Sequence, residues 1–242
     1  MTYSFTSWVT SFANMLVVAS TDTGFETMVP NAIDDAEQRL YRDLDFLNTV
    51  VRDSSTSFVA GTRFFNLPAA NGTFYVVDSI YAITPASAST ADSGTRNELI
   101  PSSRPFINAL FPSANGSGVP AYFAMQTQTS IIVGPWPDQS YPMEVVGTIR
   151  PPPLSSTNVT TLLTVYVPDL WMAATMVYGT GYQQNFGGMG GAATDNPAMA
   201  VNWESHYDTL LKSAQVEEAR KKFTSQGWSS KQPAELATPP RT

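Results

Sequence analysis

The 242-residue sequence contains no cysteine and only one histidine, His206. The absence of cysteine excludes disulfide bonds, thiolate metal ligands and a cysteine nucleophile. A single histidine cannot build a metal site that needs several imidazoles. A Ser-His-Asp triad has to use His206, but the chain contains no G-x-S-x-G motif to supply its serine. These absences predict a protein without catalytic residues, metal or cofactor, in which His206 lies at the surface or in an interface.

Charged residues are scarce as well: they make up 14% of the chain, against about 25% in average soluble domains. Their distribution is uneven. Residues 1–211 contain seven Lys and Arg but seventeen Asp and Glu, whereas residues 212–242 contain six Lys and Arg and three Asp and Glu. An acidic body disfavours tight binding of duplex DNA, which requires basic surfaces. A surface poor in charge is typical of subunits that are largely buried in an assembly.

No apolar run approaches the roughly 20 residues of a membrane span, so we expect no membrane association. The apolar patch at residues 15–19 resembles the core of a signal peptide, but the first basic residue is Arg39. A signal peptide needs basic residues before its apolar core. We interpret residues 1–20 as an amphipathic first helix instead. Its apolar face has four members: Trp8, Phe12, Met15 and Leu16.

The clearest helical pattern begins near Pro30 and runs to about residue 47. Proline suits the first helical position, because its missing N–H has no intrahelical partner there. Asp35 and Arg39 are spaced as a favourable i,i+4 ion pair. The pattern predicts a helix with one apolar stripe, formed by Val29, Ile33, Ala36, Leu40, Leu44 and Leu47.

Residues 54–153 contain only five acids and four bases, and their short β-branched and aromatic runs predict strands. The run at 74–83 has apolar residues on both sides, which indicates a central strand. Residues 126–129 are predicted to form a hairpin turn between two further strands. The remaining strands are predicted at 122–125, 130–133 and 143–149.

Helical patterns return after the three prolines at 151–153. A helix that begins at Pro168 has small side chains that allow a second helix to approach closely. A glycine-rich segment at 187–191 then leads to the last helix. Because this segment lacks the lysine and the spacing of a phosphate-binding loop, we interpret it as a connection between helices. The last helix ends in two i,i+4 pairs, Glu217 with Lys221 and Glu218 with Lys222.

Together these patterns predict an α+β protein: an antiparallel helical bundle with an antiparallel β-rich domain inserted between its second and third helices. The bundle comprises residues 1–53 and 154–227, and the inserted domain residues 54–153. Residues 228–242 are expected to form an extended C-terminal tail.

Trp136 lies between two prolines, with Tyr141 and Tyr122 nearby in the sequence. Such aromatic residues either stack on sugars, as in a carbohydrate-binding module, or pack in a corner of the fold. The sequence leaves both interpretations open. Loss of glycan binding on Trp136→Ala would favour the first.

Four segments, in this order, resemble tailed-bacteriophage head-to-tail adaptor (connector) proteins. An early helix with alanine, glutamate and two arginines matches residues 36–44 (AEQRLYRDL). A strand that ends in a proline-x-proline turn matches residues 131–138 (IIVGPWPD). The return to helix matches residues 150–155 (RPPPLS) and 168–171 (PDLW). The resemblance covers roughly residues 26–215, and the loops at 86–95 and 112–118 depart from it.

The resemblance implies a structural protein of the virion neck, made in the host cytoplasm and without catalytic residues. Such adaptors form a homo-oligomeric ring, commonly of twelve subunits, beneath the portal protein. The ring extends the channel through which genomic DNA passes without sequence-specific binding. It also presents a platform for tail nozzle or tail fibre proteins. The alternative is a different tail component, such as a nozzle or fibre-anchoring protein.

On this basis four groups of residues receive predicted roles. Asp43 and Asp45 are predicted to line the channel. They are not predicted to bind a metal, because residues two apart on a helix do not face each other. Trp136 and Asp138 belong to β loops that face the tail. Helix packing between subunits involves Ala173, Ala174, Val177 and Gly181. Docking on the portal involves Lys221, Lys222, Trp228, Lys231, Leu236 and Arg241.

Overall fold

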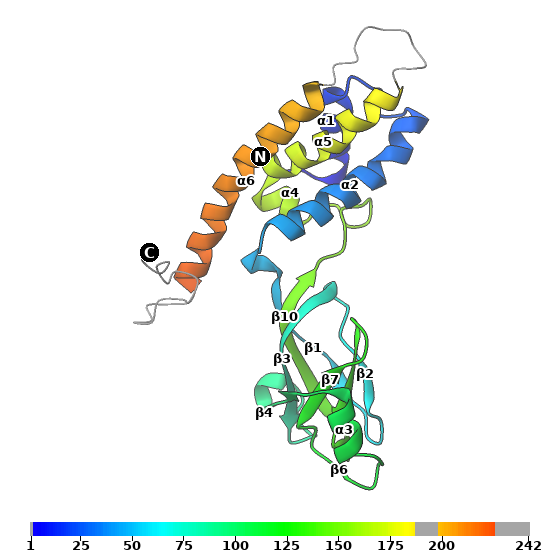
Figure 1. Ribbon diagram of the computed structural model, residues 1–242, viewed down its shortest axis with the longest axis vertical. Coiled ribbons are helices and arrows are strands. Elements are labelled where there is room, and N and C mark those ends of the chain that lie inside the picture. Colours follow the sequence, from blue (N-terminus) through cyan, green and yellow to red (C-terminus); the bar gives the residue numbers. More distant parts are fainter. Residues whose placement is uncertain (1, 187–197, 226–242) are drawn as a thin grey trace. The chain divides into compact units, whose positions relative to one another are not determined.

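The structure, a computed structural model, describes residues 2–186 and 198–225 (Figure 1). The described residues fall into two compact units. The helical unit contains the residues up to Leu47 and those from Pro153 onward, and the β unit contains Asn48–Pro152. Within the described ranges no helix is long and apolar enough to cross a membrane.

The helical unit is built around α5, which packs against α1, α2, α4 and α6 (Figure 1). Its core is rich in aromatic side chains, among which Trp8, Trp171 and Tyr207 are fully buried. The helices are α1 (Phe5–Met15), α2 (Thr23–Asp43), α4 (Leu162–Tyr166), α5 (Pro168–Phe186) and α6 (Ala198–Ser225).

The start and end predicted for the second helix are wrong. Helix α2 begins at Thr23, where the Asp22 side chain caps it by accepting a 2.9 Å hydrogen bond from the Phe25 N–H. Pro30 therefore lies inside the helix. It is exposed, so water can bond the Glu26 carbonyl that lacks a partner in the helix. The helix ends at Asp43, well before residue 47.

The β unit consists of two four-stranded sheets and a two-stranded one. Sheet A has the order β1-β10-β3-β4, formed by Val50–Phe58, Tyr141–Arg150, Thr73–Thr84 and Thr95–Glu98. Sheet B has the order β2-β8-β7-β5, formed by Phe64–Asn66, Ser130–Gly134, Tyr122–Met125 and Ile100–Pro101. The small sheet pairs β6 (Ser117–Gly118) with β9 (Trp136–Pro137). The chain also forms two short 3-10 helices, η1 (Leu47–Thr49) and η2 (Ala91–Ser93).

One apolar core lies between sheets A and B. Phe74, Ile80 and Val145 of sheet A are buried in the same cluster as Phe123 and Ile131 of sheet B. The outer face of sheet B is covered in part by the helix α3 (Arg104–Leu110), whose Ile107 packs on Ala124 and Ile132. The side chains of sheet B therefore contact apolar neighbours on both faces.

The predicted α+β class with antiparallel sheets is confirmed, apart from two short parallel pairs, β5 with β7 and β6 with β9. β3 is a central strand, as its two-sided apolar pattern predicted, because it pairs with both β10 and β4. The predicted hairpin is also present, since β7 and β8 pair in antiparallel fashion around residues 126–129. Helix α3, which has seven residues and is capped by Ser103, was not predicted.

Candidate interaction surfaces

Three of the four motif segments meet in the core of the helical unit. Glu37, from residues 36–44, accepts a 2.9 Å hydrogen bond through Oε1 from the Leu154 N–H, in residues 150–155. Leu154 and Trp171 belong to the same buried cluster as α2. The sequence motifs thus join α2, the chain that returns from the β unit and α5 into one packed unit.

The Glu37 carboxyl is only 7% exposed and has an unusual pKa. Burial raises this pKa from 4.5 to about 7, a shift opposed by the Leu154 N–H and supported by the charge of Asp34. The sequence contained a signal for this buried site, because Glu37 is a single carboxyl on the apolar side of a helix. Glu37 was not predicted as a site residue from the sequence.

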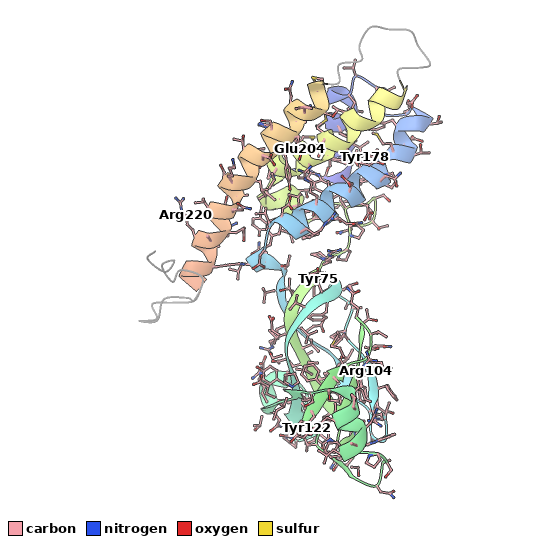
Figure 2. All side chains as sticks on the ribbon, viewed as in Figure 1. Tyr75, Arg104, Tyr122, Tyr178, Glu204 and Arg220 are labelled. Atoms are coloured by element: carbon pink, nitrogen blue, oxygen red, sulfur yellow. The ribbon has the colours of Figure 1, made fainter. Side chains whose placement is uncertain are left out.

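Helix α6 is bound to α2 by a polar network around Tyr207. The Tyr207 hydroxyl donates a 2.7 Å hydrogen bond to Asp43 Oδ2, and the Arg39 guanidinium lies 3.9 Å from the centre of the Tyr207 ring. Glu204 of α6, labelled in Figure 2, accepts a 2.8 Å hydrogen bond from Arg39 Nη1. The predicted Asp35–Arg39 pair is therefore wrong, because Arg39 pairs with Glu204 and Asp43 instead.

Tyr207→Phe is expected to lower the free energy of unfolding of the helical unit by about 1 kcal/mol, since it removes one hydrogen bond to a charged acceptor. The loss stays small because Asp43 is partly exposed to water and keeps its contact with Arg39. Chemical denaturation followed by far-UV circular dichroism measures it. Tyr166→Phe is the matched control, because Tyr166 is 57% exposed and should tolerate the change. Equal midpoints for the two variants would contradict the prediction.

The two acids predicted to line a channel make contacts within their own chain. Asp43 binds Tyr207 and Arg39, and Asp45, which follows the end of α2, pairs with Lys222 of α6. Both carboxylates therefore help to hold α2 on α6. Their role in a channel stays a prediction, and a charge reversal at either position would also perturb this helix contact.

The end of α6 shows one predicted ion pair and one exchange of partners. Lys221 binds Glu217 at 2.8 Å, which confirms the first i,i+4 pair. The second is wrong: Glu218 accepts from the Leu47 N–H and from Lys221, whereas Lys222 pairs with Asp45. Docking of Lys221 and Lys222 on a portal stays a prediction. The other docking residues lie outside the described residues, as does the glycine-rich connection: Trp228, Lys231, Leu236, Arg241 and residues 187–191.

The small residues on α5 are used mainly inside the chain. Ala173 and Ala174 are at most 1% exposed and belong to the core of the helical unit, so a second subunit does not reach them. Gly179 lies so close to Phe12 that even a Cβ would contact its ring. Val177 is half-buried and Gly181 is exposed. The prediction of packing between subunits therefore continues to apply only to Val177 and Gly181.

Trp136 lies in a packed corner. Its Nε1 donates to the Phe111 carbonyl at 3.4 Å, and the Arg63 guanidinium lies 5.2 Å from its ring centre. Tyr141 is 4% exposed, and its hydroxyl donates to Asp138 at 2.7 Å, a bond that raises the pKa of Tyr141 to about 12. A buried Tyr141 cannot stack on a sugar. The observed packing favours the corner interpretation over a carbohydrate platform.

Sheet A carries a second buried carboxylate, Glu144 of β10, which is 2% exposed. Arg52 and Arg96 bind its two oxygens at 2.8 and 2.9 Å, and both arginines also bind Asp92. These hydrogen bonds hold the pKa of Asp92 below its usual value. The four charges balance and link β1, β10, β4 and η2, so the cluster stabilises the sheet. The part of the chain that the structure describes contains no group of three potential ligands for a metal ion.

The site residues thus hold the chain together and offer no grouping of nucleophile, base and acid among the described residues. Comparison with protein families matches residues 6–229 to the SU10 adaptor protein, and the chain belongs to that family. This confirms the resemblance to phage adaptors and gives the chain a structural role in a phage, in a family that is typically non-enzymatic. A search of curated proteins finds no match.

Proposed function

We propose that this protein is a head-to-tail adaptor. Copies of the chain form a ring that docks on the portal protein, extends the DNA channel and carries nozzle or fibre proteins of the tail. In this proposal the β-rich region, residues 54–153, is a domain inserted into the helical bundle. The observation that carries the proposal is the family match, which spans residues 6–229 and therefore both units.

The charge distribution supports this role. Residues 1–38 contain no Lys or Arg, and four of their five acids (Asp22, Glu26, Asp34 and Asp35) are exposed. An acidic surface repeated around a ring repels DNA, which favours sliding over binding. Basic residues gather from residue 212 onward, where they can bind an acidic surface of a partner.

Negative-stain electron microscopy of the protein, alone and mixed with the portal ring of its own virus, tests the proposal. The expected result is a second ring stacked on the portal, present only in the mixture or much more abundant there. A chain that stays monomeric or trimeric and does not bind the portal at micromolar concentration would instead indicate a tail component located farther from the head.

Deletion of residues 228–242 is expected to abolish portal binding and to leave thermal unfolding unchanged, because an extended tail binds by ordering on its partner. Co-sedimentation with portal rings measures the binding. A full-length variant with Lys231→Glu and Arg241→Glu tests whether portal binding depends on the positive charge of the tail or only on its presence. Undiminished binding by the deleted protein would show that the tail is not the docking segment.

A further inference from the structure

The β unit contains two nearly identical tetrapeptides, each with an asparagine directly before a glycine. They are residues 70–73 (ANGT) and residues 114–117 (ANGS), and Asn-Gly occurs nowhere else in the chain. An asparagine in this position loses its side-chain amide most easily, because glycine has no Cβ to hinder attack by its own main-chain nitrogen on the amide carbon. Since the two local sequences match, a difference in reactivity between them has to come from the fold.

The contacts of Asn71 hold both partners of this reaction in place. Asn71 Nδ2 donates a 3.0 Å hydrogen bond to Oδ2 of Asp53, a side chain that is only 4% exposed. Gly72 has a φ of 135° and lies so close to Arg150 and Pro151 that a Cβ would overlap their main chain. The rotations that bring the Gly72 nitrogen to the Asn71 amide carbon are therefore restricted.

Asn115 and Gly116 have no such contacts. Both residues are exposed, and the Asn115 side chain makes no hydrogen bond within the described part of the chain. The space beside the Gly116 Cα is open, with no atom within 4 Å of the place where a Cβ would lie. Exposure to water does not separate the two sites, because Asn71 is exposed as well. What separates them is the set of contacts that only Asn71 and Gly72 make.

We propose that Asn115 is a site of spontaneous deamidation and that the fold protects Asn71 from the same reaction. The Gly116 nitrogen loses its proton to water and attacks Asn115 Cγ. A bond forms between this nitrogen and Cγ, the bond between Cγ and Nδ2 breaks, and Nδ2 leaves as ammonia with a proton from water.

Water then opens the resulting succinimide ring. It adds to one of the two ring carbonyl carbons, and the bond from that carbon to the ring nitrogen breaks. Attack at Cγ gives aspartate, and attack at the main-chain carbonyl carbon gives isoaspartate. Water is the only co-reactant, and nothing is oxidised or reduced.

Either product adds a negative charge to the β unit. Isoaspartate also lengthens the main chain by one atom just before β6, whose Ser117 pairs with Trp136 of β9. The reaction needs only this loop and water, so it is independent of ring formation and of the proposed function.

Incubation of the purified full-length protein at mildly alkaline pH, followed by chymotrypsin digestion and mass spectrometry, tests the proposal. A deamidated peptide gains about 1 Da, because an NH2 group is replaced by OH. In the folded protein we expect Asn115 to react at least about tenfold faster than Asn71, which must first lose its contacts by local opening. In concentrated urea the two rates are expected to agree within about twofold, because the fold no longer distinguishes the matched sequences.

Gly116→Ala is the matched variant. The site has room for a methyl group and a φ outside the left-handed region, so the fold is kept. The methyl group hinders the attacking nitrogen and is expected to slow the reaction at Asn115 about tenfold. Equal rates at the two sites in the folded protein, or an Asn115 that reacts only in urea, would overturn the inference.

Discussion

Trp8→Ala is expected to lower the free energy of unfolding of the helical unit by about 3–5 kcal/mol, the cost of removing a fully buried aromatic side chain from a packed core. Trp8 is 0% exposed, with its ring stacked on Phe12 at 5.1 Å and tilted against Trp171 at 5.8 Å between centroids. Its Nε1 also donates to Thr175 Oγ1 at 3.4 Å. The substitution therefore leaves a cavity between α1 and α5 and removes the bond to Thr175, whose hydroxyl still donates to the Met172 carbonyl at 2.9 Å.

Thermal unfolding followed by the helical circular dichroism signal measures this loss. Met15→Ala on the same helix is the control, because Met15 is 45% exposed and its replacement should change stability by less than about 0.5 kcal/mol. Met15 was predicted on the apolar face of this helix, and its exposure shows that this prediction was wrong. Equal destabilisation by the two variants would show that α1 packs differently.

Glu37→Gln is expected to stabilise the protein above pH 7 and to have little effect near pH 4. The pKa of Glu37 in the folded protein is about 7, higher than the ordinary 4.5. As the pH rises, the unfolded chain therefore loses the Glu37 proton at a lower pH than the folded protein does. The stability contributed by neutral Glu37 is present below pH 4.5 and is lost as the pH rises to about 7. Over that window the loss is on the order of 3 kcal/mol.

Glutamine removes this dependence, because it stays neutral and its side-chain oxygen can still accept from the Leu154 N–H. The measurement is the midpoint of urea unfolding at several pH values between 4 and 8. Glu26→Gln serves as the control, since Glu26 is exposed on the same helix. A constant difference between Glu37→Gln and the natural protein across this range would show that Glu37 does not titrate there.

Strands whose apolar pattern and adjoining turn are both visible in the sequence were predicted with nearly correct bounds. Residues 122–125 coincide with β7, and the turn at 126–129 joins it to β8. In these segments the apolar pattern and the polar turn agree with the final packing. α3 was missed because a seven-residue helix has too few turns for periodicity to be visible.

Helix boundaries were predicted less well where a tertiary factor overrides a local rule. Pro30 is a good first residue for a helix, but Phe25, Met28 and Val29 before it are all buried in the core. Burial of these three side chains stabilises the preceding turns by more than one missing hydrogen bond costs. The helix consequently extends back to Asp22, a better cap.

The sequence by itself determined the class of this protein: its α+β composition, the absence of thiols and of multi-histidine sites, and the ordered motifs of an adaptor. These depend on residue types and on short spacings, which are local properties. Only the tertiary structure decided which charges meet, as for Arg39 with Glu204 and Asp45 with Lys222, 165 and 177 residues apart. It also decided which apolar side chains stay exposed, since Ala173 is buried and Phe64 is not. Burial and ion pairing depend on distances through space, and a spacing along the chain does not contain them.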